Sequence, residues 1–289
     1  MSESLVWFIT GCSSGIGYHV SLKALERGDK VIATSRNSSK LEELKSKGAY
    51  CMDFNVNSSE TEIKKSMEHA ISVYGTIDVV VNNSGYGEYG AVEECGSRVL
   101  EEQYRTNLFG PIKVVTAILP HFRKNKKGLI LNVGSSAAFD HYPILGLYAS
   151  SKLALKSLSI TLDNEIKQFN IRSIFLAIGM FRTNLLSNLS TRKKDVVANA
   201  ISDYDDMRNE VVETFQKWDQ KQTGDPRLLA DKLIHLAHND GDFKGKEIPS
   251  VLIFGKDSIE IIAKDANENL SLIKKWENVI VSTDRTDWV

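Results

Sequence analysis

Short apolar segments alternate with longer amphipathic ones along most of the chain. The apolar segments are rich in β-branched residues and almost continuously hydrophobic, which is typical of strands buried on both faces; they are 5–10, 30–35, 49–54, 77–82, 128–133, 171–178 and 250–254. Helical spacing predicts helices over 15–27, 58–74, 97–124, 145–169, 226–239 and 258–280. This alternation predicts an α/β fold in which a doubly wound parallel sheet of about seven strands is flanked by helices.

The domain organisation follows from the continuity of this pattern. No Gly/Pro-rich linker or internal repeat divides the chain, so we predict a single domain over residues 1–289. The pattern breaks at 183–225, a polar insertion with apolar residues at helical spacing, namely Val196, Ala200, Tyr204, Met207, Val211, Val212 and Phe215. Open α/β sheets bind ligands beyond the carboxyl ends of their strands, so we interpret the insertion as a helical lid. An ordinary surface helix would give the same pattern.

Charge and cysteine content exclude several classes of function. The net charge is −1 and the basic residues are scattered, so neither nucleic acid nor an anionic membrane is an expected partner. Cys12, Cys51 and Cys95 have neither disulfide nor metal-site spacing, and we expect free thiols and no metal. With no secretion signal and no membrane span in the sequence, a cytoplasmic location is expected.

A glycine-rich loop follows the first predicted strand and precedes a predicted helix. It comprises Thr10, Gly11, Cys12, Ser13, Ser14, Gly15, Ile16 and Gly17. Its glycines permit a tight turn and close approach of a ligand to the backbone, while the free N–H groups of the helix start attract a pyrophosphate. A glycine-rich turn alone is weak evidence, but the strand before it and the helix after it favour a dinucleotide site in a Rossmann-like sheet.

The end of the second strand bears on the choice of dinucleotide. A carboxylate that would bind a ribose 2′-hydroxyl is absent there, and the sequence instead places Arg36 after Ser35. A guanidinium can make charge-assisted hydrogen bonds to a 2′-phosphate, so we predict NADP(H) in preference to NAD(H). A solvated surface arginine is the alternative.

Polar residues at the next two strand ends extend this predicted site. Asp53 follows the third strand, where it could accept a hydrogen bond from the adenine amino group. The fourth strand ends in Asn82-Asn83-Ser84-Gly85, which can line the cofactor cleft. Each would be an ordinary turn residue if it occurred alone.

The candidate catalytic residues lie after the fifth strand. Ser135 follows that strand, and thirteen residues later a helix carries Tyr148 and Lys152, which share one helix face because they are four residues apart. A nearby ammonium and a positive nicotinamide ring would lower the pKa of the phenol. Ser135 could hold a substrate oxygen, with Ser136 as the alternative, while Tyr148 transfers the proton and Lys152 also binds ribose hydroxyls.

These motifs, in this order, resemble the classical short-chain dehydrogenases/reductases over nearly the whole chain. The family's Thr-Gly-x-x-x-Gly-x-Gly loop falls on Thr10, Gly11, Gly15 and Gly17, its adenine-side Asp on Asp53, and its Asn-Asn-Ala-Gly on 82–85, with Ser84 in place of Ala. The resemblance implies that Asn107 is the catalytic Asn that holds a water in a proton relay to Lys152. It also implies that Ser14 and Arg36 share a 2′-phosphate.

One departure from the family pattern concerns the loop after the sixth strand. The resemblance implies that Ile178, Gly179 and Thr183 lie beside the nicotinamide carboxamide, but the family has Pro-Gly where this chain has Ile178-Gly179. Because Ile has a freer φ than Pro, we expect a less rigid loop.

The resemblance also gives expectations about substrate and assembly. Gly224-Asp225-Pro226 and the long last helix are similar to the branch of retinol- and hydroxysteroid-dehydrogenase-like enzymes and microbial carbonyl reductases. Residues expected to line the substrate pocket are Glu88, Phe139, His141, Leu145, Met180, Phe181 and Tyr204. Family members usually pair through the helices at 97–124 and 145–169, so a homodimer or homotetramer is expected.

Three functional hypotheses follow. The first is an NADPH-dependent reductase of a ketone or aldehyde with Tyr148 as the proton donor. The second is a dehydrogenase of the same fold that oxidises a steroid, retinoid or sugar-type alcohol. The third is a non-catalytic dinucleotide sensor, against which the intact set of Ser135, Tyr148, Lys152 and Asn107 argues.

Overall fold

Seven parallel strands form one sheet in the order β3-β2-β1-β4-β5-β6-β7. We describe residues 4–187 and 200–285 from a computed structural model of the chain. The strands are β1 (Val6–Ile9), β2 (Lys30–Ser35), β3 (Tyr50–Asp53), β4 (Val79–Asn82), β5 (Gly128–Val133), β6 (Ile171–Ile178) and β7 (Val251–Phe254). All seven predicted strands are confirmed, and the strand order reverses between β1 and β4 as a doubly wound sheet requires.

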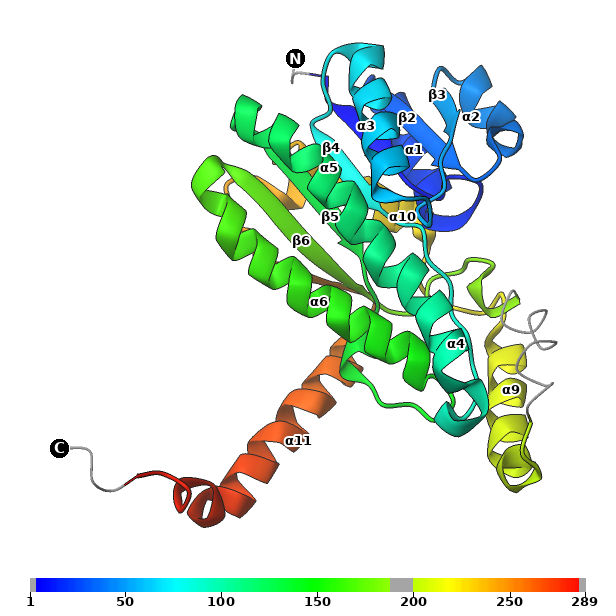
Figure 1. The fold of residues 1–289 in the computed structure, drawn as a ribbon, viewed down its shortest axis with the longest axis vertical. Helices are drawn as coiled ribbons and strands as arrows, with labels where there is room; N and C mark the ends of the chain where they lie inside the picture. Colours follow the sequence, from blue (N-terminus) through cyan, green and yellow to red (C-terminus); the bar gives the residue numbers. More distant parts are fainter. Residues whose placement is uncertain (1–3, 188–199, 286–289) are drawn as a thin grey trace.

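Helices cover both faces of the sheet in a single domain (Figure 1). On one face α1 (Gly15–Arg27) packs against α10 (Pro226–Ala237), and α3 (Glu60–Tyr74), α4 (Val92–Tyr104), α5 (Gly110–Asn125) and α6 (Gly146–Ile166) cover the other. The short α2 (Glu42–Ser46) precedes β3. Local sequence fixes these ends: Ser59 and Glu62 form a capping box at α3, and Asp225 caps α10 just before Pro226.

Residues 97–124 are helical as predicted, but the helix is not a regular α-helix throughout. The structure has α4, then a π-helical turn over Arg105–Phe109, then α5. Pro111 explains the interruption, because it has no N–H to donate to the carbonyl of Asn107 four residues earlier. Gly110 also lies against Val56, where a side chain at position 110 would approach the Val56 Cβ to 2.9 Å. The interruption places Asn107 on a π-turn, a feature frequent at functional sites.

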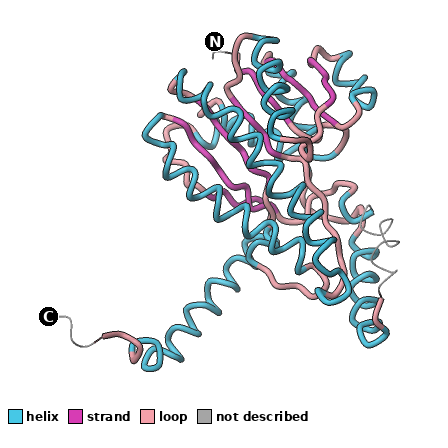
Figure 2. The backbone as a smooth tube through the Cα atoms, in the orientation of Figure 1, coloured by secondary structure: helices cyan, strands magenta, loops and turns pink. Residues whose placement is uncertain are grey.

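The insertion contains α9 (Asp205–Trp218), which is shorter than the apolar pattern suggested. Val211 and Phe215 are buried as expected, whereas Ala200 and Tyr204 precede the helix and Val196 lies outside the described residues. The last helix, α11 (Lys256–Val281), projects away from the rest of the fold (Figure 2). Among residues 4–187 and 200–285, no helix combines the length and apolarity that a membrane crossing needs.

A buried carboxylate ties the sheet to α6. Asp163, only 3% exposed, accepts bidentate hydrogen bonds from Arg172 at 2.9 and 3.0 Å, and further bonds from Ser173 N at 2.8 Å and Ser250 Oγ at 2.7 Å. Burial by itself would raise the pKa of Asp163, but these hydrogen bonds outweigh it and hold the pKa below its usual value. One side chain thereby connects α6, β6 and the residue before β7.

Replacing this carboxylate is expected to destabilise the fold in a pH-dependent way. Asp163→Asn should lower the free energy of unfolding by about 2–3 kcal/mol at pH 7, because it leaves Arg172 without its charged partner. The stabilisation exists above the unfolded-state pKa, near 3.9, and is lost as pH falls through the depressed folded-state pKa. Urea unfolding at pH 7 and near pH 3.5 should show the difference from wild type shrinking in acid. Glu165→Gln, exposed on the same helix, is the control and should change neither value.

Candidate active site

The loops after β1 and β4 are joined by a pair of side chains. Thr10 Oγ1 accepts from the backbone N–H groups of Asn83 at 2.9 Å and Ser84 at 3.0 Å. In the other direction, the Asn83 side-chain amide donates to Thr10 O at 2.9 Å and to Gly11 O at 3.1 Å. The predicted glycine loop and the Asn-Asn-Ser-Gly segment therefore meet at the carboxyl edge of the sheet, where the strand order reverses.

The glycines of the first loop are needed for their backbone shape and for space. Gly11 and Gly15 have φ values of +73° and +61°, which side chains rarely adopt. A Cβ at Gly17 would lie 2.5 Å from Asn83 Nδ2 and 2.8 Å from Gly11 O. Thr183, from the loop after β6, lies against Gly15, since a Cβ at Gly15 would meet Thr183 Cγ2 at 3.3 Å. This brings together two predicted cofactor-binding segments that are far apart in sequence.

The start of α1 has the features of an anion site. Ser14 is the N-cap residue, but its side chain makes no capping hydrogen bond, and the first turn carries no acidic residue. Ser13 and Ser14 are exposed, whereas Ile16 is buried in the core between α1 and the sheet. Uncapped N–H groups and the helix dipole suit a phosphate group, so the residues present fit the dinucleotide that the sequence predicts.

Arg36 and Asp53 lie at the carboxyl ends of the neighbouring strands β2 and β3. Arg36 is exposed just after β2, whose last residue, Ser35, pairs with Asp53 in the sheet. Asp53 accepts from Ser38 N at 2.6 Å, and hydrogen bonding to Ser38 lowers the pKa of its exposed carboxyl. Asp53 therefore fixes the turn that follows Arg36, a role that the sequence did not reveal.

The predicted catalytic side chains converge beyond β5. Ser135 caps a short 3-10 turn, Ser136–Phe139, by accepting from Ala137 N at 3.1 Å, and it is hydrogen bonded to Tyr148 in the first turn of α6. Lys152, one turn further along α6, places Nζ 5.8 Å from the centre of the Tyr148 ring. The i, i+4 spacing thus does what the sequence predicted: it brings the ammonium to the phenol.

In the chain alone the pKa of the phenol is raised, whereas the lowering expected from the sequence also involves the positive nicotinamide ring. Burial raises the pKa of Tyr148, and the hydrogen bond with Ser135 offsets only part of that rise. Lys152 Nζ donates to Val133 O at 2.8 Å, and burial also lowers the pKa of its ammonium. The chain by itself therefore keeps Tyr148 protonated at neutral pH, the form that a proton donor requires.

Lys152 is buried, with 5% of its surface exposed. Desolvation lowers the pKa of its ammonium from 10.5 to about 8, so the group is still mostly charged at pH 7 but titrates in the mildly alkaline range. Gly85 lies against it, since a Cβ at Gly85 would come within 3.5 Å of Lys152 Nζ and 3.2 Å of Asn107 Oδ1. The glycine after β4 thus leaves room for both predicted catalytic side chains.

The side chain of Asn107 is committed to the backbone of the loop after β4. Its Nδ2 donates to Tyr86 O at 2.8 Å and Ser151 Oγ at 3.1 Å, and its Oδ1 accepts from Tyr86 N at 3.1 Å. Asn82 is likewise turned inward, donating to Asn132 Oδ1 at 2.9 Å within a buried polar network. Asn107 thus holds the loop after β4, and Asn82 holds the end of β4 against β5. The water relay through Asn107 stays a prediction.

The loop that lacks the family proline is fastened by Asp257 from the start of α11. Met180 N donates to Asp257 Oδ2 at 2.6 Å, and Gly179 N donates to Phe254 O at 2.8 Å. A side chain at Gly179 would collide with the Asp257 carboxylate at 2.1 Å. The freedom expected from Ile178 is therefore restricted by a carboxylate that is far away in sequence and that sequence reasoning missed.

The residues expected to line a substrate pocket fall into different environments. Leu145 and Met180 join one apolar cluster, in which α9 packs on the loops before α4 and α6; its buried members are Tyr89, Ile144, Leu186, Val211 and Phe215. Phe139 packs elsewhere, beneath Lys156 and beside the base of α11, and Phe181 packs toward α10 and forms a bridge to Gly224. His141 is exposed.

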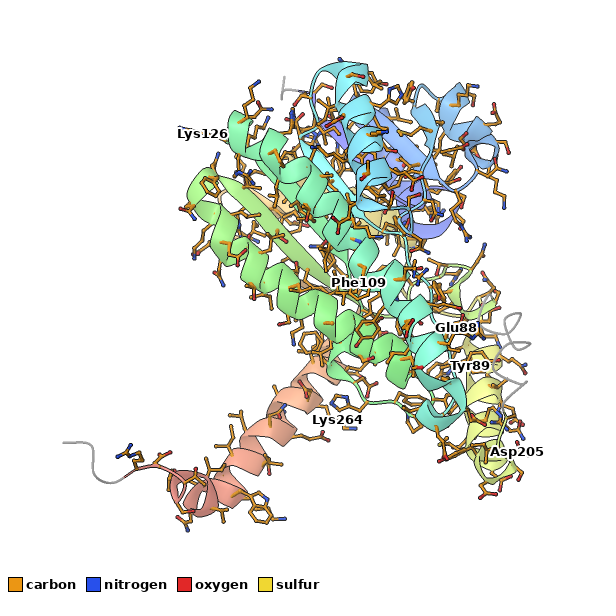
Figure 3. The ribbon with its side chains drawn as sticks, viewed as in Figure 1. Glu88, Tyr89, Phe109, Lys126, Asp205 and Lys264 are labelled. Atoms are coloured by element: carbon orange, nitrogen blue, oxygen red, sulfur yellow. The ribbon has the colours of Figure 1, made fainter. Side chains whose placement is uncertain are left out.

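Around α4, an ion pair that the sequence did not suggest holds α9 in place. The Glu94 side chain is fully buried and accepts from Ile201 N at 2.9 Å, from Ala91 N at 3.0 Å and from Arg208 of α9. Tyr204 donates to Glu93 at 2.8 Å rather than facing an apolar pocket. Glu88 and Tyr89 lie between α4 and α9 (Figure 3), with Glu88 N bonded to Gln103 Oε1 at 2.7 Å.

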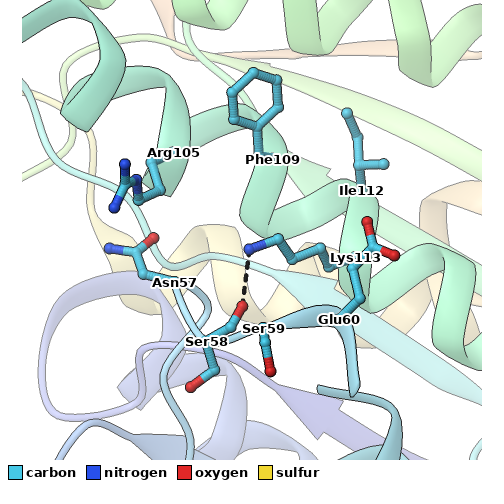
Figure 4. Close-up of a pocket in the computed structure, with 8 residues that line it drawn as sticks. All are labelled: Asn57, Ser58, Ser59, Glu60, Arg105, Phe109, Ile112 and Lys113. Atoms are coloured by element: carbon cyan, nitrogen blue, oxygen red, sulfur yellow. Dashed lines mark hydrogen bonds between the residues drawn. The ribbon is translucent and has the colours of Figure 1, made fainter. Parts of the chain in front are cut away.

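A separate surface pocket of about 320 Å³ lies between the start of α3 and the start of α5 (Figure 4). It is lined by Asn57, Ser58, Ser59, Glu60, Arg105, Phe109, Ile112 and Lys113, and Lys113 Nζ donates to Ser58 O at 2.8 Å across it. None of these residues belongs to the predicted site. Among the described residues, no group of three or more His, Cys, Asp or Glu side chains is arranged to hold a metal ion.

Comparison with known proteins places this geometry in a family. Residues 5–194 match the family described as short chain dehydrogenase, and the chain therefore belongs to the short-chain dehydrogenases, which are oxidoreductases.

Individual relatives agree with this assignment. The chain is 32% identical to the uncharacterized oxidoreductase YusZ of Bacillus subtilis, over 79% of this chain and 83% of that protein. It is 29% identical to oxidoreductase BOA17 of Botryotinia fuckeliana, over 96% of this chain and 98% of that protein. A short-chain dehydrogenase from Streptomyces avermitilis superposes with a TM-score of 0.82 at 26% identity, covering 98% of this chain and all of that one.

The burial of Lys152 predicts that removing its charge makes the protein more stable, although Lys152 is a predicted catalytic residue. Lys152→Met should raise the free energy of unfolding at pH 7 by about 2 kcal/mol. Lowering the pKa of the ammonium from 10.5 to about 8 costs the folded state roughly 3 kcal/mol, and the lost bond to Val133 O costs about 1 kcal/mol. Wild-type stability should rise as pH climbs from 8 toward 10.5, since only the unfolded lysine still binds a proton there. The stability advantage of Lys152→Met over wild type should therefore disappear by about pH 10, as measured by urea unfolding. A variant less stable than wild type at pH 7 would contradict this account.

Proposed function

We propose that this protein is an NADPH-dependent carbonyl reductase that converts a ketone or aldehyde to an alcohol, with Tyr148 as the proton donor. The observation that carries the proposal is the convergence of Ser135, Tyr148 and Lys152 at the carboxyl edge of the sheet. Beside it, the glycine loop leaves the N-terminus of α1 open to a phosphate. A purely structural role would need neither feature.

The mechanism divides the work among these residues. The bound dinucleotide supplies the hydride. Ser135 holds the substrate oxygen, and the Tyr148 hydroxyl donates its proton to that oxygen as negative charge develops there. Lys152, held by Val133 O, places a positive charge beside the phenol, which eases loss of its proton. Lys152 would also bind the ribose hydroxyls, and Asn107 would hold the water of the relay to Lys152.

The preference for NADP(H) over NAD(H) rests on the residues after β2. Arg36 is exposed there, and Ser13 and Ser14 are exposed on the adjoining loop. Asp53, the carboxylate at the end of the neighbouring strand β3, is bonded to Ser38 N through Oδ1. A guanidinium beside free hydroxyls suits a 2′-phosphate, and Gly179 and Thr183 would flank the nicotinamide.

The substrate should be of moderate size and largely apolar, with one polar group besides the carbonyl. The wall that α9 forms with Leu145 and Met180 is apolar, and Leu145 is the N-cap residue of α6, three residues before Tyr148. Within it, the Tyr89 hydroxyl is buried with no hydrogen-bond partner among the described residues. Because an unpaired buried hydroxyl is costly, a substrate group that bonds Tyr89 would be favoured.

Assembly into a homodimer or homotetramer through α5 and α6 is part of the proposal. Their outer faces, with the end of α4 and the turn before α5, expose large apolar side chains: Leu100, Phe109, Ile112, Leu153 and Leu158. Apolar side chains grouped on neighbouring helices favour burial against a partner. The cytoplasmic location expected from the sequence stays a prediction.

Removing the phenolic hydroxyl tests the mechanism. Tyr148→Phe should lower kcat for NADPH oxidation by at least about 100-fold, because general acid catalysis contributes roughly that much or more. NADPH binding, followed by its fluorescence, should remain within about three-fold of wild type, a change of less than 1 kcal/mol. The substrate panel should span ketones and aldehydes, with the matching alcohols and NADP⁺ to test the oxidative alternative. Equal turnover by both proteins would reject Tyr148 as the donor, and no turnover by wild type would favour a dinucleotide sensor.

Reversing the charge at position 36 tests the cofactor preference. Arg36→Asp should weaken NADPH binding by about 2–3 kcal/mol, roughly 30- to 150-fold, because a carboxylate would face the 2′-phosphate. NADH binding should change little or improve, and Kd values for both cofactors measure the difference. The control is Lys40→Asp, an exposed charge reversal on the same turn. A wild-type preference for NADH would overturn the argument from Arg36.

A further inference from the structure

The last two thirds of α11 lie outside the body of the protein. Figures 1 and 2 show the helix leaving the sheet at the end of β7 and extending into solvent. Ser258 is buried and Ile262 packs against the cluster beneath α6, whereas every residue from 266 to 281 is exposed. A helical segment of this length is only marginally stable in water without tertiary packing. The exposed part therefore needs a partner.

An apolar stripe runs along this helix. Its members recur every three to four residues and therefore share one face; they are Ile259, Ala263, Ala266, Leu270, Ile273, Trp276 and Ile280. The large ones are far from buried, with exposures of 62% at Ile259, 65% at Leu270, 54% at Ile273 and 49% at Trp276. Solvated apolar side chains in such an array mark a surface that binds another molecule.

The charges on α11 favour a protein partner over a lipid surface. Helices that lie on anionic membranes carry a polar face rich in Lys and Arg. α11 contains five carboxylates and four lysines. The carboxylates are Asp257, Glu260, Asp265, Glu268 and Glu277, and the lysines are Lys256, Lys264, Lys274 and Lys275. A helix with this slight acidic excess has no electrostatic attraction to an anionic bilayer.

The distribution of these charges identifies the partner. The first half, 256–268, holds four carboxylates and two lysines, whereas the second half, 269–281, holds two lysines and one carboxylate. An antiparallel copy of the same helix would place each basic half beside an acidic half. A parallel copy would place like beside like, which is unfavourable.

Side-chain size along the stripe points the same way. The stripe has small residues in its first half, at Ala263 and Ala266, and large ones in its second half, at Leu270, Ile273 and Trp276. Antiparallel pairing sets large side chains over small ones, which allows two helices to interdigitate. We propose that α11 pairs antiparallel with α11 of a second copy of this chain, with the two helices crossing near Leu270.

Single cysteines test the pairing in the full-length protein, in a background in which the partly exposed Cys51 is Ser; Cys12 and Cys95 are buried. Leu270→Cys lies at the crossing and should link to its own copy with a short bismaleimide. It should react on the order of 100-fold faster than Ser271→Cys, because a held pair reacts at an effective concentration of about millimolar. Ser271, exposed on the opposite face of α11, reports random collisions.

Cysteines at the two ends of the stripe test the direction. Ile280→Cys alone should not link, but a mixture of Ile280→Cys and Ile259→Cys chains should. Self-linking of Ile280→Cys would indicate parallel helices and overturn the proposal. Failure of both Leu270→Cys and the mixture would also overturn it and assign the stripe to another partner, a lipid surface included.

Charge reversal provides a second measurement that leaves the stripe intact. Lys274→Glu with Lys275→Glu should slow linking of the Ile280/Ile259 mixture by about ten-fold, equivalent to about 1.4 kcal/mol. Adding Glu260→Lys and Asp265→Lys to the same chain should restore the rate, because the two halves are then oppositely charged again. No slowing, or further slowing by the second pair, would contradict antiparallel pairing.

Discussion

The site depends on the bonds that join the ends of β1 and β4. A doubly wound sheet has its ligand crevice where the strand order reverses, and here the crevice is braced by Thr10 and Asn83. Each residue bonds the backbone of the other loop, so moving one loop alone would break these hydrogen bonds. Gly17 then packs so closely on Asn83 that any side chain would displace it. The start of α1 is positioned by this brace, and with it the place where a phosphate can bind.

The sequence predicted the fold well because a buried parallel sheet has a strong local signature. Each strand is an unbroken apolar run, and the spacing of Tyr148 and Lys152 is itself a helical contact. Asp257 and Glu94 were missed because their partners, Met180 and Arg208, are far away in sequence. Only the three-dimensional packing gives these carboxylates a function.

The π-helical turn between α4 and α5 was not predicted, although the sequence did contain its signal. Pro111 denies an α-helical donor to the carbonyl of Asn107, but the apolar periodicity on either side outweighed it. The effect of burial on the Tyr148 pKa could not be predicted from the sequence for a third reason. Burial depends on the whole fold, and it weakens the charge of Lys152 while it raises the pKa of the phenol.

The two halves of the predicted site, one for the nucleotide and one for the substrate, are held by different interactions. The nucleotide half is fixed by glycine packing and backbone hydrogen bonds, which leave little freedom to move. The substrate half is attached through two carboxylates, Glu94 to α9 and Asp257 to the loop after β6. Since Asp257 is also in the first turn of α11, anything that fixes that helix also fixes the loop at Met180. Pairing of α11 between two copies would therefore steady the segment that is expected beside the nicotinamide, where the family pattern has a proline that this chain lacks.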